Sequence, residues 1–233
     1  MHLFYQPNIE AEGILDESES SHAVKVLRLK NGDIISVLDG KGKILKSVIT
    51  KADFRKCEIL IKEEIYTPRL PFRNCIAIAP TKNADRTEWF VEKAVEIGVD
   101  EITFIQCERS ERKHLNLERI QKVAISAVKQ SLKSYMPLIN ELISYSTFLK
   151  NCESDYKFVA HLGEGERRYL QSSITVNSKT TVLIGPEGDF TDGEVRKAFE
   201  AGFVPVSLGE SRLRTETAGI VSCHLMNLAN SKK

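Results

Sequence analysis

The sequence predicts an α/β protein with a smaller, strand-rich region at its N-terminus. From residue 72 onward, short apolar runs alternate with segments of helical periodicity, a pattern typical of a mostly parallel sheet covered by helices on both faces. The first seventy residues instead hold β-rich runs joined by a tight-turn signal. The two patterns meet at Pro68-Arg69-Leu70-Pro71, where neither proline favours continuing a strand or a helix. We therefore expect one domain over residues 1–70 and a second over 72–233.

The N-terminal region predicts a small β-barrel or sandwich. Asp39-Gly40 lies between the runs 33–38 and 43–49 and indicates a hairpin, because glycine accepts the positive φ of the turn. The run 57–61 alternates polar and apolar residues as a third strand would. A short helix is expected over 21–30. Its expected buried residues are Val24, Val26 and Leu27, and its expected outer residues are Lys25, Arg28 and Lys30.

In the larger region, helix boundaries are marked by capping residues. Gly98 follows a helix expected over 85–97, with Phe90, Ala94 and Ile97 on one face. Asn116 is expected to cap a long helix that ends near Pro137. Thr191 and Glu194 form a capping-box pattern before a helix that ends at Gly202 and turns Val195, Ala198 and Phe199 inward. The last helix is expected over 215–228, and the strands over 74–80, 101–105, 156–161, 180–184 and 203–208.

Composition excludes several classes of protein. No run approaches the roughly 18 apolar residues of a membrane span. The segment 1–7 lacks the basic and apolar parts of a signal peptide, so a cytoplasmic location is expected. The five cysteines are scattered and the histidines show no ligand spacing, which argues against disulfides and against a metal site.

Positive charge is concentrated in two segments of a chain whose formal net charge is only +1. Residues 41–62 hold seven Lys and Arg against two acids, a net charge of +5. Residues 105–140 hold seven against three, a net charge of +4. Such patches fit a polyanionic partner, and a lysine-rich solvated surface is the alternative.

Three loops of unusual composition leave expected strand ends, at 161–165, 185–189 and 208–214. Ligands of parallel sheets bind at the carboxyl ends of strands. Glycines let the backbone approach a flat heterocycle such as adenine, although each loop taken alone could be a tight turn. No phosphate-loop motif is present, and Gly163-x-Gly165 lacks the third glycine of a dinucleotide fingerprint.

The last fifty residues resemble the signature of the SPOUT (α/β-knot) methyltransferases, and within these the family that makes 3-methyluridine in small-subunit ribosomal RNA. The family loop G-P-E-G-G-[FL] corresponds to residues 185–190, and L-G-x-R-I-L-R-x-E-T-A corresponds to 208–218. Two departures are Asp189 for the second glycine and Ser211-Arg212 for Arg-Ile. Further similar motifs are His22-x3-Val26-Leu27-Arg28, Gly32-Asp33, Asp39-Gly40, Lys82-x3-Arg86-x-Glu88, Glu92-Lys93-Ala94, Glu96-x-Gly98-Val99, Arg109-Ser110 and Gln130-Ser131-x5-Pro137.

This resemblance implies a trefoil-knotted SPOUT methyltransferase domain, S-adenosylmethionine as cofactor, and a PUA/OB-like β-barrel at residues 1–70 that binds RNA. It also implies a homodimer that shares its substrate site, and 16S rRNA of the small ribosomal subunit as partner. Independently of the resemblance, Trp89 is expected in the core or in a dimer interface. No membrane partner and no metal are expected.

The resemblance and the glycine loops together give the candidate site residues. The catalytic candidates are Arg214, as a cation for the uracil anion, and Glu216. Their alternatives are an ion pair of Arg214 with Glu216 or Glu187, and a helix-dipole role for Glu216. No convincing general base is found. The cofactor candidates are Leu162, Ile184, Gly185, Pro186, Glu187, Gly188, Leu208, Gly209, Leu213, Thr217 and Ala218. The RNA-phosphate candidates are Lys25, Arg28, Arg109, Arg112 and Lys133, each also readable as a plain surface residue.

Two other functions stay open at this point. One is a knot-fold methyltransferase that acts on tRNA, at a ribose hydroxyl or another base. The other is a non-catalytic RNA-binding protein of ribosome assembly that keeps the fold. Binding of S-adenosylmethionine separates the enzymes from the non-catalytic protein.

Overall fold

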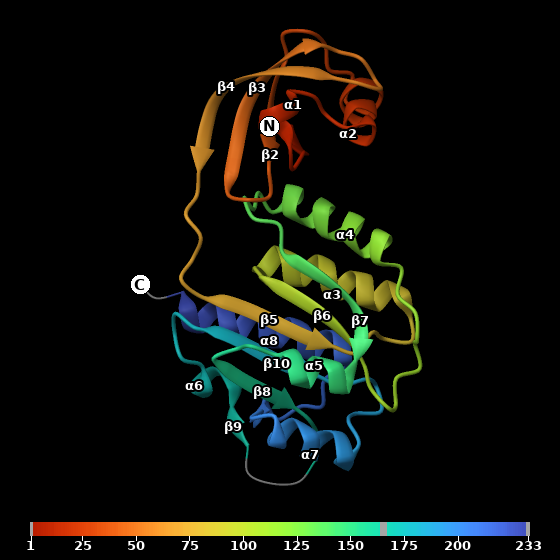
Figure 1. Ribbon diagram of the computed structural model, residues 1–233, viewed down its shortest axis with the longest axis vertical. Helices are drawn as coiled ribbons and strands as arrows, with labels where there is room; N and C mark the ends of the chain where they lie inside the picture. Colours follow the sequence, from red (N-terminus) through yellow and green to blue (C-terminus); the bar gives the residue numbers. More distant parts are fainter. Residues whose placement is uncertain (1, 164–166, 232–233) are drawn as a thin grey trace. The chain divides into compact units, whose positions relative to one another are not determined.

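The computed structural model describes residues 2–163 and 167–231 (Figure 1). The chain divides into two compact units. Unit 1 comprises Met1–Arg69 together with Val128–Met136, and unit 2 comprises Leu70–Ala127 and Pro137–Lys233. The local residue pattern gave no indication that segment 128–136 packs with the N-terminal residues.

Unit 1 is built on a four-stranded sheet in the order β1-β2-β3-β4. The antiparallel pairing of β2 with β3 and of β3 with β4 confirms the expected hairpin. Gly40 has φ +72°, and Asp39 Oδ1 accepts hydrogen bonds from the N–H groups of Lys41 (2.7 Å) and Lys43 (2.9 Å), which fixes the turn. An unpredicted N-terminal strand pairs parallel to β2. The strands are β1 (Leu3–Tyr5), β2 (Ile34–Leu38), β3 (Lys43–Lys51) and β4 (Glu58–Tyr66).

The helix expected over 21–30 begins and ends earlier. After a short α1 (Ile9–Glu12), Asp16 caps α2 (Glu17–Ser21), which continues as a π-helical turn, η1 (His22–Val26). The helix stops there because Arg28 adopts a left-handed conformation with φ +56°. Ala23, rather than Val26, is the fully buried residue of this segment. The expected burial of Val26 is wrong, since 67% of its surface is exposed.

Within unit 1, a largely buried ion pair joins segment 128–136 to the N-terminal residues. Lys129 Nζ lies 2.6 Å from Glu19 Oε1 and 2.9 Å from Oε2. The side chains of Lys129 and Glu19 are only 18% and 11% exposed. Each charge stabilises the other, because a buried charge without its partner would be poorly solvated.

We expect Lys129→Met to lower the free energy of unfolding by about 3 kcal/mol, because the Glu19 carboxylate would be left buried without its partner. Urea denaturation measures the change. The matched control on the same helix is Lys122→Met, which removes an exposed pair with Glu118 and should cost less than about 0.5 kcal/mol. Adding Glu19→Gln to Lys129→Met should recover most of the loss. If Lys129→Met and Lys122→Met lowered the free energy of unfolding equally, the buried pair would have no special role in stability.

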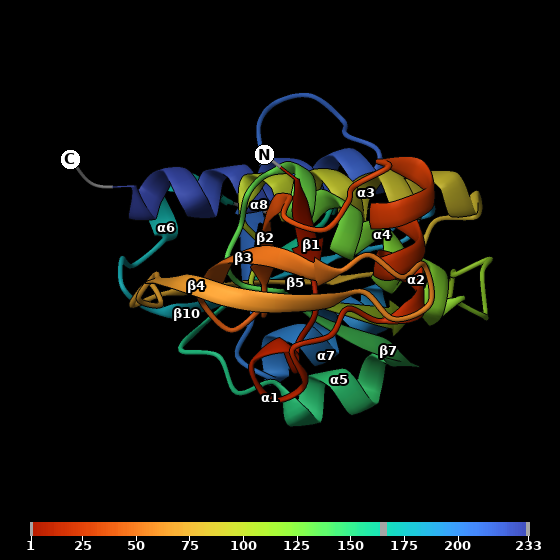
Figure 2. The same cartoon turned by 90° about the horizontal axis from the view of Figure 1, so that it is seen from above.

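Unit 2 holds a seven-stranded sheet whose strand pairs are all parallel, in the order β7-β6-β5-β10-β8-β11-β9. Helices α3 and α8 cover one face and α5 and α7 the other (Figure 2). The strands are β5 (Arg73–Ile78), β6 (Glu101–Gln106), β7 (Leu138–Ser144), β8 (Tyr156–Ala160), β9 (Arg168–Tyr169), β10 (Lys179–Ile184) and β11 (Val204–Ser207). The helices are α3 (Ala84–Ile97), α4 (Leu117–Gln130), α5 (Tyr145–Asn151), α6 (Leu170–Ser173), α7 (Asp192–Glu200) and α8 (Thr215–Asn230).

The capping predictions in this unit are confirmed. Gly98 ends α3 with φ +119°, Asn116 Oδ1 accepts the N–H of Arg119 (3.0 Å), and Thr191 forms a capping box with Glu194. Two details are wrong. Helix α4 ends at Gln130 instead of near Pro137, because Leu132 turns left-handed (φ +55°). Phe199 is exposed, although Ala198 beside it is fully buried.

Strand β7 and helix α5, together with the short β9 and α6, were not predicted. No helix among residues 2–163 and 167–231 is long and apolar enough to cross a membrane.

Candidate functional site

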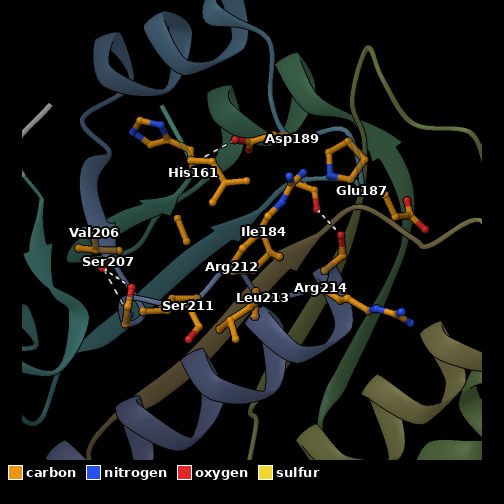
Figure 3. A pocket seen from close by; sticks show the side chains of 18 of the residues that line it. His161, Ile184, Glu187, Asp189, Val206, Ser207, Ser211, Arg212, Leu213 and Arg214 are labelled. Carbon is orange, nitrogen blue, oxygen red and sulfur yellow. Dashed lines mark hydrogen bonds between the residues drawn. The ribbon is translucent and has the colours of Figure 1, made fainter. Parts of the chain in front are cut away.

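The three glycine-containing loops, of which residues 164 and 165 lie outside the described part of the chain, contribute residues to one cavity of about 480 Å³ in unit 2. In Figure 3, His161 and Asp189 lie on one side of this hollow and Ser211 and Leu213 on the other, with Ile184 between them. Parallel pairing brings the loops together, because Ile184 of β10 and Val206 of β11 both pair with Ala160 of β8. The loops that follow β8, β10 and β11 therefore all begin at the same edge of the sheet.

Most of the predicted cofactor residues line this cavity. They are Leu162, Ile184, Gly185, Pro186, Glu187, Leu208, Gly209, Leu213 and Ala218. Gly188 and Thr217 lie outside the lining. Gly188 backs onto Arg109 instead, since a Cβ added there would stand 3.4 Å from Arg109 Cδ. Of the two glycines that line the cavity, Gly185 has no room for a side chain, because an added Cβ would come within 3.1 Å of the Phe190 ring.

The loop after β10 is held by contacts from two neighbouring loops. Glu187 Oε1 accepts the backbone N–H of Lys82 (2.9 Å), and Arg109 Nη1 donates to the carbonyl of Gly188 (2.8 Å). Arg112 donates to the carbonyls of Thr81 (2.9 Å) and Lys82 (2.6 Å). The expected phosphate contacts of Arg109 and Arg112 stay predictions, but both guanidinium groups already serve to brace backbone around the cavity.

Asp189 stands where the family pattern has glycine, and its backbone explains that pattern. Its φ is +61°, a left-handed conformation that glycine adopts freely and aspartate tolerates better than most residues. Its carboxylate accepts hydrogen bonds from the N–H groups of Leu162 (Oδ2, 2.8 Å) and Phe190 (Oδ1, 2.8 Å). The side chain therefore ties the loop after β8 to the loop after β10, at some cost in backbone strain.

We expect Asp189→Ala to lower the free energy of unfolding by about 2 kcal/mol, because alanine keeps the left-handed strain and loses the hydrogen bond between the loops. Asp189→Gly should cost only about 1 kcal/mol, since the strain is relieved. Asp189→Asn, which keeps one acceptor oxygen, is the control. Urea denaturation and hydrogen exchange of the Leu162 amide measure the effects, and a glycine variant less stable than the alanine variant would contradict this account.

The two catalytic candidates differ in exposure. Arg214 is exposed and lines the cavity, and among the described residues no ion pair joins it to Glu216 or Glu187. Glu216 is 6% exposed, outside the lining, in the first turn of α8. Its Oε1 lies 3.8 Å from Arg86 Nε, and its Oε2 is buried without a hydrogen-bond partner. Arg86 lines the cavity, so Glu216 is linked to the cavity through Arg86, for which the sequence predicted no role.

His161 and Arg167 also line the cavity and were missed as site residues. Burial lowers the pKa of His161, which favours the neutral ring, while the nearby Asp189 carboxylate opposes this. Its Nδ1 accepts the N–H of Gly163 (3.0 Å), so the neutral ring carries its proton on Nε2, which is buried without a partner. Arg167 donates a hydrogen bond to the carbonyl of His161. The acceptor nitrogen of His161 is thus engaged, and the ring is not a free base.

No group of three or more His, Cys, Asp or Glu among the described residues could hold a metal ion. The cavity instead offers backbone groups at glycines, apolar side chains and arginines. These groups can hold a flat heterocycle and stabilise an anion.

Comparison with known proteins gives matches to both parts of the chain. Residues 68–227 match the model of the RNA methyltransferase domain, and residues 15–62 match that of the RNA methyltransferase PUA domain. The chain is 31% identical to the ribosomal RNA small subunit methyltransferase E of Mesomycoplasma hyopneumoniae, over 84% of this chain and 86% of that protein. It is 30% identical to the protein of the same name from Aquifex aeolicus, over 97% of this chain and all of the relative.

Solved structures agree with these matches. A probable rRNA-methyltransferase from Porphyromonas gingivalis is 42% identical, with 99% of each chain covered and a TM-score of 0.90. The ribosomal RNA small subunit methyltransferase E of Neisseria gonorrhoeae, solved bound to S-adenosyl methionine, is 30% identical, with 99% of this chain and 98% of that chain covered and a TM-score of 0.88.

Proposed function

The chain belongs to the RNA methyltransferase family, and from this premise we propose that it transfers the methyl group of S-adenosylmethionine to N3 of a uridine in 16S rRNA of the small ribosomal subunit. Its fold is that of the SPOUT (α/β-knot) methyltransferases, with an N-terminal PUA-like region. The observation that carries the proposal is the single cavity formed by the loops after β8, β10 and β11, in a fold shared with a relative solved with this cofactor.

The cavity fits S-adenosylmethionine in size and chemistry. Its volume of about 480 Å³ lies within the range of small-molecule sites. Ile184, Leu208 and Leu213 supply apolar walls for an adenine ring, and the glycines leave backbone N–H and C=O groups accessible to its edge. When bound, the cofactor supplies an electrophilic methyl group.

The protein's own contribution is to align the uracil and to stabilise its anion. Uridine N3 must lose its proton before it can attack a methyl carbon, and the resulting charge spreads over the uracil oxygens. Arg214, exposed on the cavity wall and always protonated, is placed to hold one of these oxygens. Arg86, paired with the buried Glu216, adds a second cation at the same cavity. The proton of N3 leaves to solvent.

The decisive experiment incubates the protein and labelled S-adenosylmethionine with small subunits that lack the modification. We expect label in 3-methyluridine of 16S rRNA, identified by nucleoside mass spectrometry. Label in 2′-O-methyl nucleosides, or only in tRNA, would instead support a knot-fold tRNA methyltransferase. Absence of cofactor binding at millimolar concentration would leave a non-catalytic assembly protein.

We expect Arg214→Ala to lower kcat about 100-fold with little change in cofactor affinity, because one donor to the developing anion is lost. Subunits reconstituted with 5-fluorouridine test the cause, since fluorine acidifies N3 and reduces the need for a cation. The defect of Arg214→Ala should therefore shrink on this substrate. A defect of the same size on both substrates would mean that Arg214 acts in binding or folding. Arg196→Ala, which removes an exposed arginine of α7 outside the cavity lining, is the control and should leave kcat unchanged on both substrates.

The expected homodimer belongs to the same proposal. Trp89 on α3 is 44% exposed, which excludes a core position within one chain and leaves the interface alternative. We expect light scattering to give twice the 26.3 kDa chain mass, and Trp89→Lys to give a monomer with unchanged cofactor affinity per chain. A dimer that persists in Trp89→Lys would place the interface elsewhere.

A ribosomal substrate also supports the expected cytoplasmic location.

A further inference from the structure

The β3–β4 turn of unit 1 carries an exposed aromatic ring surrounded by cations. The ring is that of Phe54, which is 38% exposed at the tip of the turn. We propose that Phe54 is a stacking platform for one unpaired nucleobase of RNA, and that the cations around it bind the adjoining phosphates. This inference rests on the proposed function, because it assigns to unit 1 a contact with the RNA substrate. We call the surface formed by Lys25, Arg28, Lys30, Phe54 and Arg55 the Phe54 platform.

The turn is built in a way that holds Phe54 outward. Asp53 Oδ1 accepts hydrogen bonds from the N–H groups of Arg55 (2.8 Å) and Lys56 (3.3 Å), which closes the turn around the ring. The same bonds, that from Arg55 above all, lower the pKa of Asp53. The one acidic side chain of the turn is therefore engaged with backbone and stays ionised, and the cations Lys25, Arg55 and Lys56 around it outnumber it.

Cations lie within reach of the ring. Lys25 Nζ stands 3.9 Å from the centroid of the Phe54 ring, and Arg55 Cζ stands 5.3 Å from it. Both distances are those of cation–π contacts. Lys25 is exposed on a long stem, so its ammonium can move from the ring to the phosphate of a nucleotide that stacks there. An aromatic face bordered by mobile cations is how proteins bind single-stranded nucleic acid.

A hollow of about 550 Å³ lies on the side of segment 24–31 that approaches the β3–β4 turn. Arg28, Lys30 and Asn31 provide its polar wall, and Val24, Leu29 and Ala52 its apolar wall. Asn31 Oδ1 accepts the N–H of Ala52 (2.7 Å), which joins this hollow to the turn that bears Phe54. Both views of the molecule show the β3–β4 turn beside α2, the helix that leads into this segment (Figures 1 and 2). The hollow can therefore take the nucleotide next to the stacked one.

The combination of ring and charge favours RNA over an acidic protein. An acidic peptide would use the cations and gain little from the Phe54 face. A nucleotide uses both, because every base has a π-face and every linkage a phosphate. Phe54 is thus the residue whose loss separates these two partners.

The test measures binding of the full-length protein by fluorescence anisotropy. The probes are a labelled eight-nucleotide single-stranded RNA and an abasic ribose-phosphate oligomer of the same length. We expect Phe54→Leu, which keeps an apolar side chain without a π-face, to bind the RNA about tenfold more weakly than wild type. Its affinity for the abasic oligomer should be unchanged. Phe54→Tyr should bind both probes as wild type does.

Two controls show that the effect belongs to the platform. Tyr156→Leu removes an equally exposed aromatic ring (38%) in unit 2 and should leave both affinities unchanged. Arg28→Ala should weaken both probes and reduce the dependence of binding on salt. Equal RNA affinity of wild type and Phe54→Leu would overturn the platform. An equal loss on RNA and abasic oligomer would also overturn it, in favour of a purely anionic partner such as an acidic peptide.

Methylation of small subunits separates this inference from the proposed function. If wild type methylates the subunit, Phe54→Leu should raise KM for the subunit about tenfold and leave kcat unchanged. An unchanged KM would overturn the platform while the methyltransferase proposal stands. Failure of wild type to methylate any RNA would overturn the proposed function, and the oligomer measurements would still decide the platform.

Discussion

The candidate site depends above all on the parallel pairing of β10 with β5 on one side and with β8 on the other. The register sets Ile184 opposite Ile78 and Ala160, so the loop after each strand begins at the same edge. A slip of one residue in β10 would turn Val182 and Leu183, both fully buried, to the opposite faces. The bond from Thr215 Oγ1 to the carbonyl of Gly185 (3.1 Å) then fixes the start of α8 to this edge.

The sequence predicted well those structural features that depend on residues close together in the chain. The Thr191–Glu194 capping box, the Gly98 helix end and the hairpin at Asp39-Gly40 each lie within a few residues, and each is confirmed. The glycine loops were also identified from local composition, and they meet at one cavity, while the ligand of that cavity stays a prediction. Features decided by distant residues were not predicted. Glu19 and Lys129 are 110 positions apart. The apolar residues of β7 come in the pairs 138–139 and 142–143, without the alternation that marks a half-buried strand.

The arginines near the cavity show the same limit. The excess of Lys and Arg over residues 105–140 predicted polyanion binding, which stays a prediction. The structure shows that Arg109 and Arg112 of this segment are engaged with backbone carbonyls of the surrounding loops. Arg86 had no predicted role and is the one paired with a buried carboxylate at the cavity. Asp189 has one feature of each kind. Its left-handed backbone is a local feature, while its hydrogen bond to the N–H of Leu162 joins residues 27 positions apart. A guanidinium group has several donors, and only the folded chain determines where each is used.

The discontinuity of unit 1 sets an order on folding during synthesis. Residues 1–69 leave the ribosome well before Val128–Met136, so the early chain holds Glu19 without Lys129 and Gly42 without the carbonyl of Ser134 that accepts its N–H. The N-terminal unit therefore cannot be completed as an early, separate module. Its last segment is made only after α3, β6 and most of α4. A nascent chain stalled before residue 128 should expose an unfinished N-terminal core to chaperones and proteases.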